Sequence, residues 1–225
     1  MAVSKAQEVE RIVDAIYRAI LEQRLKAGTR LVETRLVDVM QANRNHVRAA
    51  INVLRLRKVV TVEPNRGAFV AKPEQEEARE IIEARRMIEN SMMVRVGAKY
   101  TARHLRRLEK VLQQERKAEA TGSRHGLIKY SGEFHLELAR ITKNRRLVEM
   151  LQNLIAESSL IAGLYENTGD FTLTIDQHQG IYEALKQGDL ARLPVLMDQH
   201  LASVEQRLLR HKVPERELDL ADILG

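Results

Sequence analysis

The first seventy residues change from a helical to an extended pattern of apolar positions. An amphipathic helix is predicted over residues 8–24, because apolar side chains recur there every three or four positions: Val9, Ile12, Val13, Ile16, Ile20 and Leu21. A second, shorter helix is predicted over 33–40. A third helix is predicted to start at a cap, either Asn43 or Asn45, and to run to about Arg57.

The pattern after the third helix indicates strands. Residues 59–62 are mostly β-branched, a turn follows at Pro64–Gly67, and residues 68–70 are again mainly apolar, which predicts a β-hairpin. Three helices followed by a hairpin form a winged helix-turn-helix, which we expect to occupy residues 1–73.

The third predicted helix has two distinct faces. Its apolar face would pack on the other two helices and carries Val47, Ala50, Ile51 and Leu54. Its opposite face carries Arg44, Asn45, Arg48, Asn52 and Arg55. Arg and Asn match purine edges and phosphates in the major groove, so we expect base contacts from the N-terminal end of the helix, at Arg44, Asn45 and Arg48. In the wing, Asn65, Arg66 and Gly67 can approach the DNA backbone or minor groove. The alternative is a small helical domain with an exposed basic face.

The charge distribution favours the DNA-binding interpretation. Residues 1–73 hold 14 Lys and Arg against 7 Asp and Glu, whereas residues 74–225 hold 23 against 24. A basic first third followed by a neutral remainder suggests a module that binds a polyanion, joined to a second domain. The absence of cysteine excludes disulfides, thiolate metal sites and a cysteine nucleophile, and favours a reducing cytoplasm. No apolar run approaches 18 residues, so we expect no membrane span.

Pro73 marks the expected domain boundary. Beyond it, long amphipathic patterns punctuated by Gly122, Gly169 and Gly188 predict an all-α helical bundle over 74–225. The six expected helices cover residues 76–98, 101–120, 124–142, 145–167, 172–187 and 189–211. The fold class is therefore mainly α, with a winged helix-turn-helix in front of the bundle.

Three of the seven histidines fall on inward faces of these helices. They are His135, His178 and His200, each beside an apolar stripe on a different predicted helix. Three such imidazoles can converge on one metal ion. By sequence alone, three hydrogen-bonded core histidines are the safer interpretation.

The N-terminal third resembles the DNA-binding domain of the GntR family of bacterial transcription regulators. The stretches that carry the resemblance are "AGTRLVETRLVDVM", "NRNHVRAAINVL" and "VVTVEPNRGAFVA". Through this resemblance Arg35 in the second helix is a further expected DNA contact. Several positions depart from the family pattern and put the operator sequence in doubt: Asn43 and Asn45 stand where Ser and Thr are usual, and His46, Ala49 and Lys58 replace Pro, Glu and Gly. Asn43 and Asn45 remain among the expected DNA contacts.

The C-terminal part resembles the FCD effector domain of the FadR-like branch of the same family, through "EFHLELARITKNRRL", "QHQGIYEALKQGDL" and "MDQHLASV". Many such domains hold a divalent metal, zinc or nickel, with an Asp-x3-His pair and two later histidines. His135, His178 and His200 match the histidines, but Ser131 occupies the Asp position. The resemblance therefore implies a metal site of three histidines, weakened by the loss of the anionic ligand, with water, the effector or Ser131 completing it.

The same resemblance implies a small organic acid as effector. The stretch "RRMIE" at 85–89 matches a family feature, and we expect Arg86 to hold the acid's carboxylate. The alternative is an intrahelical pair between Arg86 and Glu89. The histidines indicate a metal-dependent member rather than one that binds acyl-coenzyme A.

These features together predict a ligand-responsive, homodimeric transcription regulator. The resemblance implies a repressor, which we expect the acid to release from an inverted-repeat operator in double-stranded DNA. A metal-dependent hydrolase that uses the three histidines is the competing class, although no general base and no nucleotide loop are apparent. A purely structural interaction protein would explain the helices but not the basic reading face.

Overall fold

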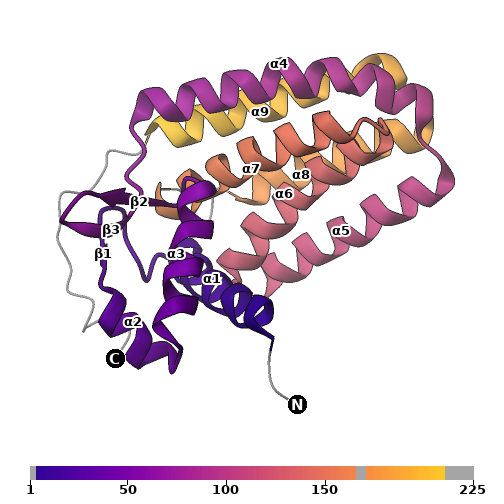
Figure 1. The fold of residues 1–225 in the computed structure, drawn as a ribbon. Helices are drawn as coiled ribbons and strands as arrows, with labels where there is room; N and C mark the ends of the chain where they lie inside the picture. The colour runs from indigo at the N-terminus through magenta and orange to yellow at the C-terminus, as the bar shows by residue number, and fades with distance from the viewer. Residues whose placement is uncertain (1–3, 166–170, 211–225) are drawn as a thin grey trace. The chain divides into compact units, whose positions relative to one another are not determined.

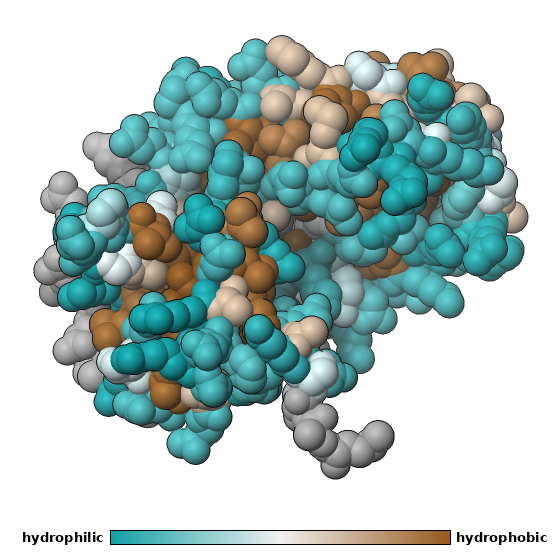
Figure 2. Space-filling model, viewed as in Figure 1, coloured by the Kyte–Doolittle hydropathy of each residue, from teal (hydrophilic) through white to brown (hydrophobic). Residues whose placement is uncertain are grey.

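A computed structural model of the protein describes residues 4–165 and 171–210. The chain separates into two compact units, with the break between Pro73 and Glu74 (Figure 1). The first unit contains helices and a small sheet, and the second contains helices, so the predicted mainly α fold class is confirmed. In Figure 2, hydrophilic residues cover most of the visible face of each unit, with apolar residues between them.

The first unit is a winged helix-turn-helix. Its helices are α1 (Lys5–Leu21), α2 (Glu33–Met40) and α3 (Arg44–Leu56). Helices α1 and α3 pack against each other, and their fully buried side chains, which form the core, include Ile12, Ile16, Val47, Ala50 and Leu54. The apolar face predicted for the third helix is thus the face that is buried.

The wing is a sheet of three antiparallel strands. The predicted hairpin consists of β2 (Val60–Glu63) and β3 (Gly67–Val70), whose register pairs Val60 with Val70. A short strand that the sequence analysis did not predict, β1 (Arg30–Leu31), adds to the other edge of β3 and gives the order β1-β3-β2. This third strand ties the start of α2 to the wing, because it immediately precedes the helix.

Local backbone chemistry sets the ends of α3. The side chain of Asn43 accepts a hydrogen bond from the backbone N–H of Asn45 at 2.8 Å, so Asn43 is the residue that caps the helix. Just beyond the other end, Lys58 has a φ of 55°. Glycine adopts this left-handed conformation without strain, which explains the glycine that the family pattern has at this position.

The second unit is a bundle of six α-helices. They are α4 (Gln75–Lys99), α5 (Ala102–Ala120), α6 (Arg124–Ile141), α7 (Arg145–Tyr165), α8 (Phe171–Gln187) and α9 (Leu193–Arg210). A short 3-10 turn, Leu190–Arg192, precedes α9, so the last α-helix begins four residues later than the predicted 189. The predictions that concern residues 166–170 and 211–225, including the turn at Gly169, lie outside the described residues.

The bundle core lies between α4, α6, α8 and α9, where α4 runs alongside α9 (Figure 1). Its fully buried members include Met93, Phe134, Leu138, Ile181 and Met197. This packing brings residues that are far apart in the sequence to one point in the bundle, where the polar side chains described below are enclosed.

One helix among the described residues, α7, is long and apolar enough to cross a membrane by length and composition alone. It packs against α4 and α6 in the bundle and buries Leu151, Ile155, Leu160 and Ile161 there. About a third of its apolar stretch is buried in this way, and core helices of soluble proteins pass the same test.

Candidate functional site

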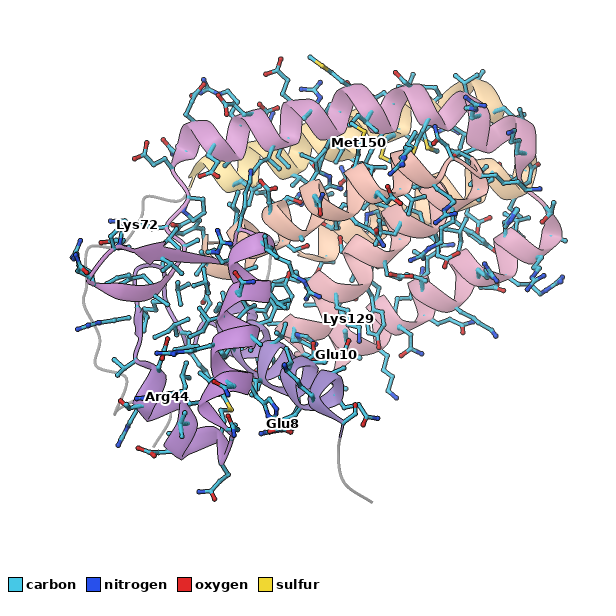
Figure 3. All side chains as sticks on the ribbon, in the orientation of Figure 1. Glu8, Glu10, Arg44, Lys72, Lys129 and Met150 are labelled. Atoms are coloured by element: carbon cyan, nitrogen blue, oxygen red, sulfur yellow. The ribbon has the colours of Figure 1, made fainter. Side chains whose placement is uncertain are left out.

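Helix α3 exposes the side chains predicted to read DNA. Arg44, Asn45 and Arg48 are exposed at its N-terminal end, which Figure 3 marks with the label at Arg44. Arg35 on α2 is exposed, and so are the wing residues Asn65, Arg66 and Gly67. Asn43 is also exposed, but its side-chain oxygen is engaged in capping α3. All predicted contacts therefore lie on the surface of one small unit, in the elements that place a helix and a wing against a duplex.

Several of these arginines are held by acidic neighbours. The Nε of Arg48 donates to Oε2 of Glu33, at the start of α2, at 2.8 Å. Arg66 pairs with Glu63 across the wing turn, and its guanidinium lies 5.5 Å from the ring centre of Phe69. Both pairs are exposed, and exposed ion pairs contribute little to stability, so these arginines can exchange their partners for phosphates or base edges.

The three histidines predicted from sequence meet in the interior of the bundle. His135 comes from α6, His178 from α8 and His200 from α9, and each is 1% exposed or less. Their Nε2 atoms converge: His135 lies 3.1 Å from His200 and 3.2 Å from His178, and His178 lies 3.3 Å from His200. The structure thus places three nitrogen donors around a single point.

The other ring nitrogen of each histidine faces an oxygen. Nδ1 of His135 lies 2.5 Å from Oε2 of Glu89, Nδ1 of His178 lies 3.0 Å from Oε1 of Glu115, and Nδ1 of His200 lies 3.1 Å from Oε1 of Gln177. A carboxylate or amide oxygen accepts hydrogen bonds, so each Nδ1 carries the proton and donates. The Nε2 lone pairs are then left without protons and point at one another, an arrangement that a cation between them stabilises.

Burial and charge fix the protonation states of this cluster. Burial lowers the pKa of His135 to about 4, and it lowers the pKa of His200 well below its ordinary value, with the neighbouring histidines adding to the effect. Burial alone would raise the pKa of Glu89, but the charge of Arg85 and hydrogen bonds from His135 and Arg85 outweigh it and hold that pKa at about 2. At neutral pH, His135 and His200 are therefore neutral ligands and Glu89 is an anion.

The spacing of the three nitrogens fits a divalent metal. Zn–N bonds of about 2.0–2.1 Å in a tetrahedral site place neighbouring nitrogens about 3.3–3.4 Å apart, and the observed separations of 3.1–3.3 Å are close to this. Ser131, at the position of the usual Asp, lies one helical turn before His135 and lines the same cavity. Among the described residues, the cluster of potential ligands is the histidine triad alone, and so the protein offers a neutral donor set.

A cavity of about 40 Å³ adjoins the histidines. Its lining includes His135 and His200, the hydroxyl residues Ser131, Ser158, Ser159 and Thr174, and the arginines Arg85 and Arg207. Arg85 is 5% exposed, and two of its three guanidinium nitrogens are occupied: Nε donates to Glu89 at 2.7 Å and Nη1 donates to Ser158 at 2.9 Å. Within the described part of the chain its Nη2 is buried and has no hydrogen-bond partner. A buried cationic N–H without an acceptor is costly, so this nitrogen marks a place for an acceptor atom of a water molecule or a ligand.

Arg86, the residue expected to hold the effector, lies elsewhere. It donates to Oδ1 of Asp198 at 2.9 and 3.0 Å and to Oε2 of Glu205 at 3.2 Å, both on α9, and it does not line the cavity. The hydrogen bond to Asp198 raises the pKa of Arg86. The alternative pair of Arg86 with Glu89 does not form either, because Glu89 pairs with Arg85. The structure therefore brings Arg85, not Arg86, to the histidines.

A winged helix-turn-helix with an exposed basic reading helix, joined to a helical domain with a small polar cavity in its interior, is typical of a ligand-sensing DNA-binding regulator. The model of the bacterial regulatory proteins of the gntR family matches residues 8–70, and the FCD domain model matches residues 80–203. The chain belongs to the GntR family and carries an FCD domain, and the predicted family is confirmed.

Relatives of known class support this assignment. The chain is 25% identical over 228 residues to the Uxu operon regulator of Haemophilus influenzae, covering 90% of this chain and 85% of that protein. It is 24% identical over 201 residues to the transcriptional repressor RspR of Escherichia coli K12, and the match covers 89% of this chain and 87% of RspR. A GntR transcriptional regulator from Rhodococcus sp. RHA1 has the same fold, with a TM-score of 0.79 at 24% identity over 90% of this chain and 97% of the other.

The protein is a DNA-binding transcription regulator with an effector-binding domain, and it is not an enzyme. The family and its relatives are regulators, so the alternative of a metal-dependent hydrolase is not supported. The two carboxylates nearest the histidines are both hydrogen-bonded to Nδ1 atoms, on the side of the rings opposite to the converging Nε2 atoms. Neither is placed to activate a water molecule at the triad.

Proposed function

We propose that the protein is a cytoplasmic, homodimeric repressor that a small organic acid releases from an inverted-repeat operator. The acid binds in the cavity beside the histidine triad, where a divalent ion, zinc or nickel, is held by His135, His178 and His200. The single observation that carries this proposal is the buried Nη2 of Arg85, which has no hydrogen-bond partner among the described residues, on a side chain that lines the same cavity as two of the histidines.

Arg85 is the anchor we propose for the carboxylate. Its Nε and Nη1 are fixed by Glu89 and Ser158, so the guanidinium is oriented before any ligand arrives. An anion at the remaining nitrogen gains a charge-assisted hydrogen bond without the cost of ordering a flexible side chain. The hydroxyl of Ser131 and that of Ser159 line the same space and offer further hydrogen bonds. A cavity of about 40 Å³ is much smaller than the usual ligand pocket of about 300–1,000 Å³, so it excludes a long chain, and even a small acid needs the lining side chains to move apart.

A bound metal would supply a positive centre at the converging Nε2 atoms, to which an acid's carboxylate or hydroxyl oxygen binds. The protein's own residues do the rest: the three Nδ1–H groups are held by oxygens, so the rings cannot rotate away from the point at which they converge. Burial of the triad excludes bulk water and strengthens the attraction for an anion.

The release of DNA follows from differential affinity. The protein has one conformation that fits the operator and another that does not. If the acid binds the second conformation more tightly, it shifts the population toward that conformation and away from DNA. The size of the shift is set by the ratio of the two acid affinities. A tenfold ratio corresponds to about 1.4 kcal/mol of coupling, which is within the usual range for such regulators.

Metal content is the first experiment. Untagged protein purified without chelators is analysed by mass spectrometry, beside His135→Ala purified in the same way. About one zinc or nickel ion per chain in the wild type, lost in the variant, is the expected result. Wild-type protein without metal after incubation with either ion would contradict the metal site.

Operator release is tested separately. Operator fragments are selected from randomised DNA with the full-length protein, and binding is measured at several salt concentrations with and without candidate acids. Steep salt dependence and a two-fold symmetric consensus are expected. An asymmetric consensus would contradict the homodimer, and binding that no small acid weakens would contradict the proposed release.

A further inference from the structure

Glu89 contacts both halves of the proposed site. It lies on α4 and is fully buried. Its Oε1 accepts a hydrogen bond from Nε of Arg85, one turn earlier on the same helix, at 2.7 Å. Its Oε2 accepts from Nδ1 of His135, on α6, at 2.5 Å. One carboxylate therefore touches the arginine with an unpartnered nitrogen and one of the three converging histidines.

The consequences for the two neighbours are different in kind. For His135, an acceptor at Nδ1 fixes the tautomer whose Nε2 has a free lone pair and faces the other two histidines. For Arg85, an acceptor at Nε fixes the plane of the guanidinium and therefore the position of Nη2. Removing the negative charge of Glu89 would disturb both groups, because each donates a hydrogen bond to it.

Two nearby residues each contact only one half of the site through the contacts that the structure describes. Glu115, on α5, accepts from Nδ1 of His178 through both of its oxygens, at 3.0 and 3.1 Å. Ser158, on α7, accepts from Nη1 of Arg85 at 2.9 Å and donates to the backbone carbonyl of Ile155. Glu115 thus supports a histidine alone, and Ser158 supports the arginine alone.

We propose that Glu89 is a positioning residue shared by metal binding and acid binding. The inference rests on the proposed function and deepens it: the two ligands of the bundle depend on one buried carboxylate, so metal affinity and acid affinity are lost together when it is neutralised. Glu115 contributes to metal affinity only, and Ser158 contributes to acid affinity only. Single substitutions of Glu89, Glu115 and Ser158 can therefore distinguish an effect on metal binding, an effect on acid binding and an effect on both.

The test uses the full-length wild type, Glu89→Gln, Glu115→Gln and Ser158→Ala. Zinc affinity is measured by competition with a chromogenic chelator in the absence of acid. Acid affinity is measured on chelator-treated, metal-free protein by titrating acetate, L-lactate and malonate separately and following the amide and arginine Nε–H signals by NMR. The thermal unfolding midpoint and the helical circular dichroism signal of each variant confirm that its bundle is folded.

The expected pattern is specific. Glu115→Gln should weaken zinc binding by roughly 10–100-fold and leave acid binding unchanged, since outer hydrogen-bond partners of metal ligands have effects of this size. Ser158→Ala should weaken acid binding and leave zinc binding unchanged. Glu89→Gln should weaken both, with a zinc effect similar to that of Glu115→Gln. If Glu89→Gln does not fold, Glu89→Asp, which keeps the charge but is too short to reach both partners, takes its place with the same expectation.

The outcomes separate this inference from the proposed function. A wild type that binds neither zinc nor any of the three acids would overturn both. A wild type that binds zinc and an acid, with a Glu89→Gln variant that loses only one of them, would overturn the shared role and leave the proposed function standing.

Discussion

The histidine triad should make the metal-free protein sensitive to mild acid. The pKa of His135 is about 4 in the folded protein, whereas an ordinary imidazole has a pKa of 6.5. As the pH falls, the unfolded chain therefore binds this proton before the native protein does, and stability decreases. The stability that the neutral His135 contributes is fully present above pH 6.5 and is lost progressively as the pH falls to 4. His200, whose pKa is also lowered by burial, acts in the same direction.

The size of the effect at pH 5 follows from these values. An unfolded imidazole with a pKa of 6.5 is almost fully protonated at pH 5, while His135 with a pKa of about 4 is mostly neutral. His135 alone therefore lowers the free energy of unfolding at pH 5 by about 2 kcal/mol relative to pH 7.5. The free energy of unfolding of a typical domain is only about 5–15 kcal/mol, so a change of this size is readily measured.

The assay is urea unfolding of chelator-treated protein at pH 7.5 and pH 5, followed by tyrosine fluorescence. Four of the five tyrosines lie in residues 74–225 and there is no tryptophan, so the signal reports mainly on the bundle. Between pH 7.5 and pH 5, the free energy of unfolding of the wild type should fall by about 2 kcal/mol more than that of His135→Asn, because the variant has no imidazole to protonate at this position. Equal losses in the two proteins would refute the buried, neutral state of His135. Saturating zinc should reduce the wild-type loss, because a metal-bound nitrogen cannot accept a proton until the ion leaves.

Three further predictions concern single side chains. Ser131→Asp should tighten zinc binding by supplying an anionic ligand one turn before the metal histidine on α6, and a weaker affinity in a chelator competition would contradict the position assigned to it. Arg48→Ala should weaken operator binding by about 1–3 kcal/mol and relax the base preference at one position, and unchanged affinity in a gel-shift titration would remove it from the reading set. Phe134→Ala should destabilise the bundle by about 3–5 kcal/mol, because this ring is fully buried and stacks on His178 with 4.4 Å between ring centres; a thermal unfolding midpoint close to that of the wild type would argue against this packing.

The local sequence signals were strong in the winged helix and weak at the edge of its sheet. The third helix combines a four-residue apolar stripe with a side-chain cap, so helical periodicity identifies it. The two hairpin strands are four residues long and are joined at a turn marked by proline and glycine, so the change to an extended pattern identifies them. Strand β1 has only two residues, Arg30 and Leu31, which is too short to show an alternating pattern. Its existence depends on pairing with β3, a contact that no local pattern contains.

In the bundle, the sequence indicated which histidines face inward but not which acids and arginines accompany them. Arg85 lies three and four residues after the buried Ile82 and Ile81, so its position on the apolar face of α4 was visible in the spacing. The motif alone does not distinguish Arg85 from Arg86, since the two are adjacent. Glu89 follows Arg85 by one turn, and a charged pair on an apolar stripe is the signal that the sequence analysis missed.

Glu115 was missed for a related reason. It continues the buried stripe of Leu108 and Leu112 on α5, so an acid stands where the helical spacing calls for an apolar residue. Such a position indicates a buried partner, but the partner, His178, is on a different helix and 63 residues away. Spacing shows that a side chain is buried; only the packing of α5 against α8 shows what it meets.

The replacement of the usual Asp by Ser131 changes the charge of the site rather than its geometry. The three imidazoles are oriented by Glu89, Glu115 and Gln177, none of which depends on residue 131. A divalent ion bound by neutral nitrogens would keep its full charge, and it would lie near the positive Arg85 and Arg207, while Glu89 and Glu115 are the carboxylates that contact the histidines. Buried uncompensated charge is costly, and an anionic ligand in the cavity removes that cost. In the proposed site, Ser131 would therefore leave the neutralisation of the metal to the effector, so we expect an acid with two negative charges to bind more tightly than one with a single charge.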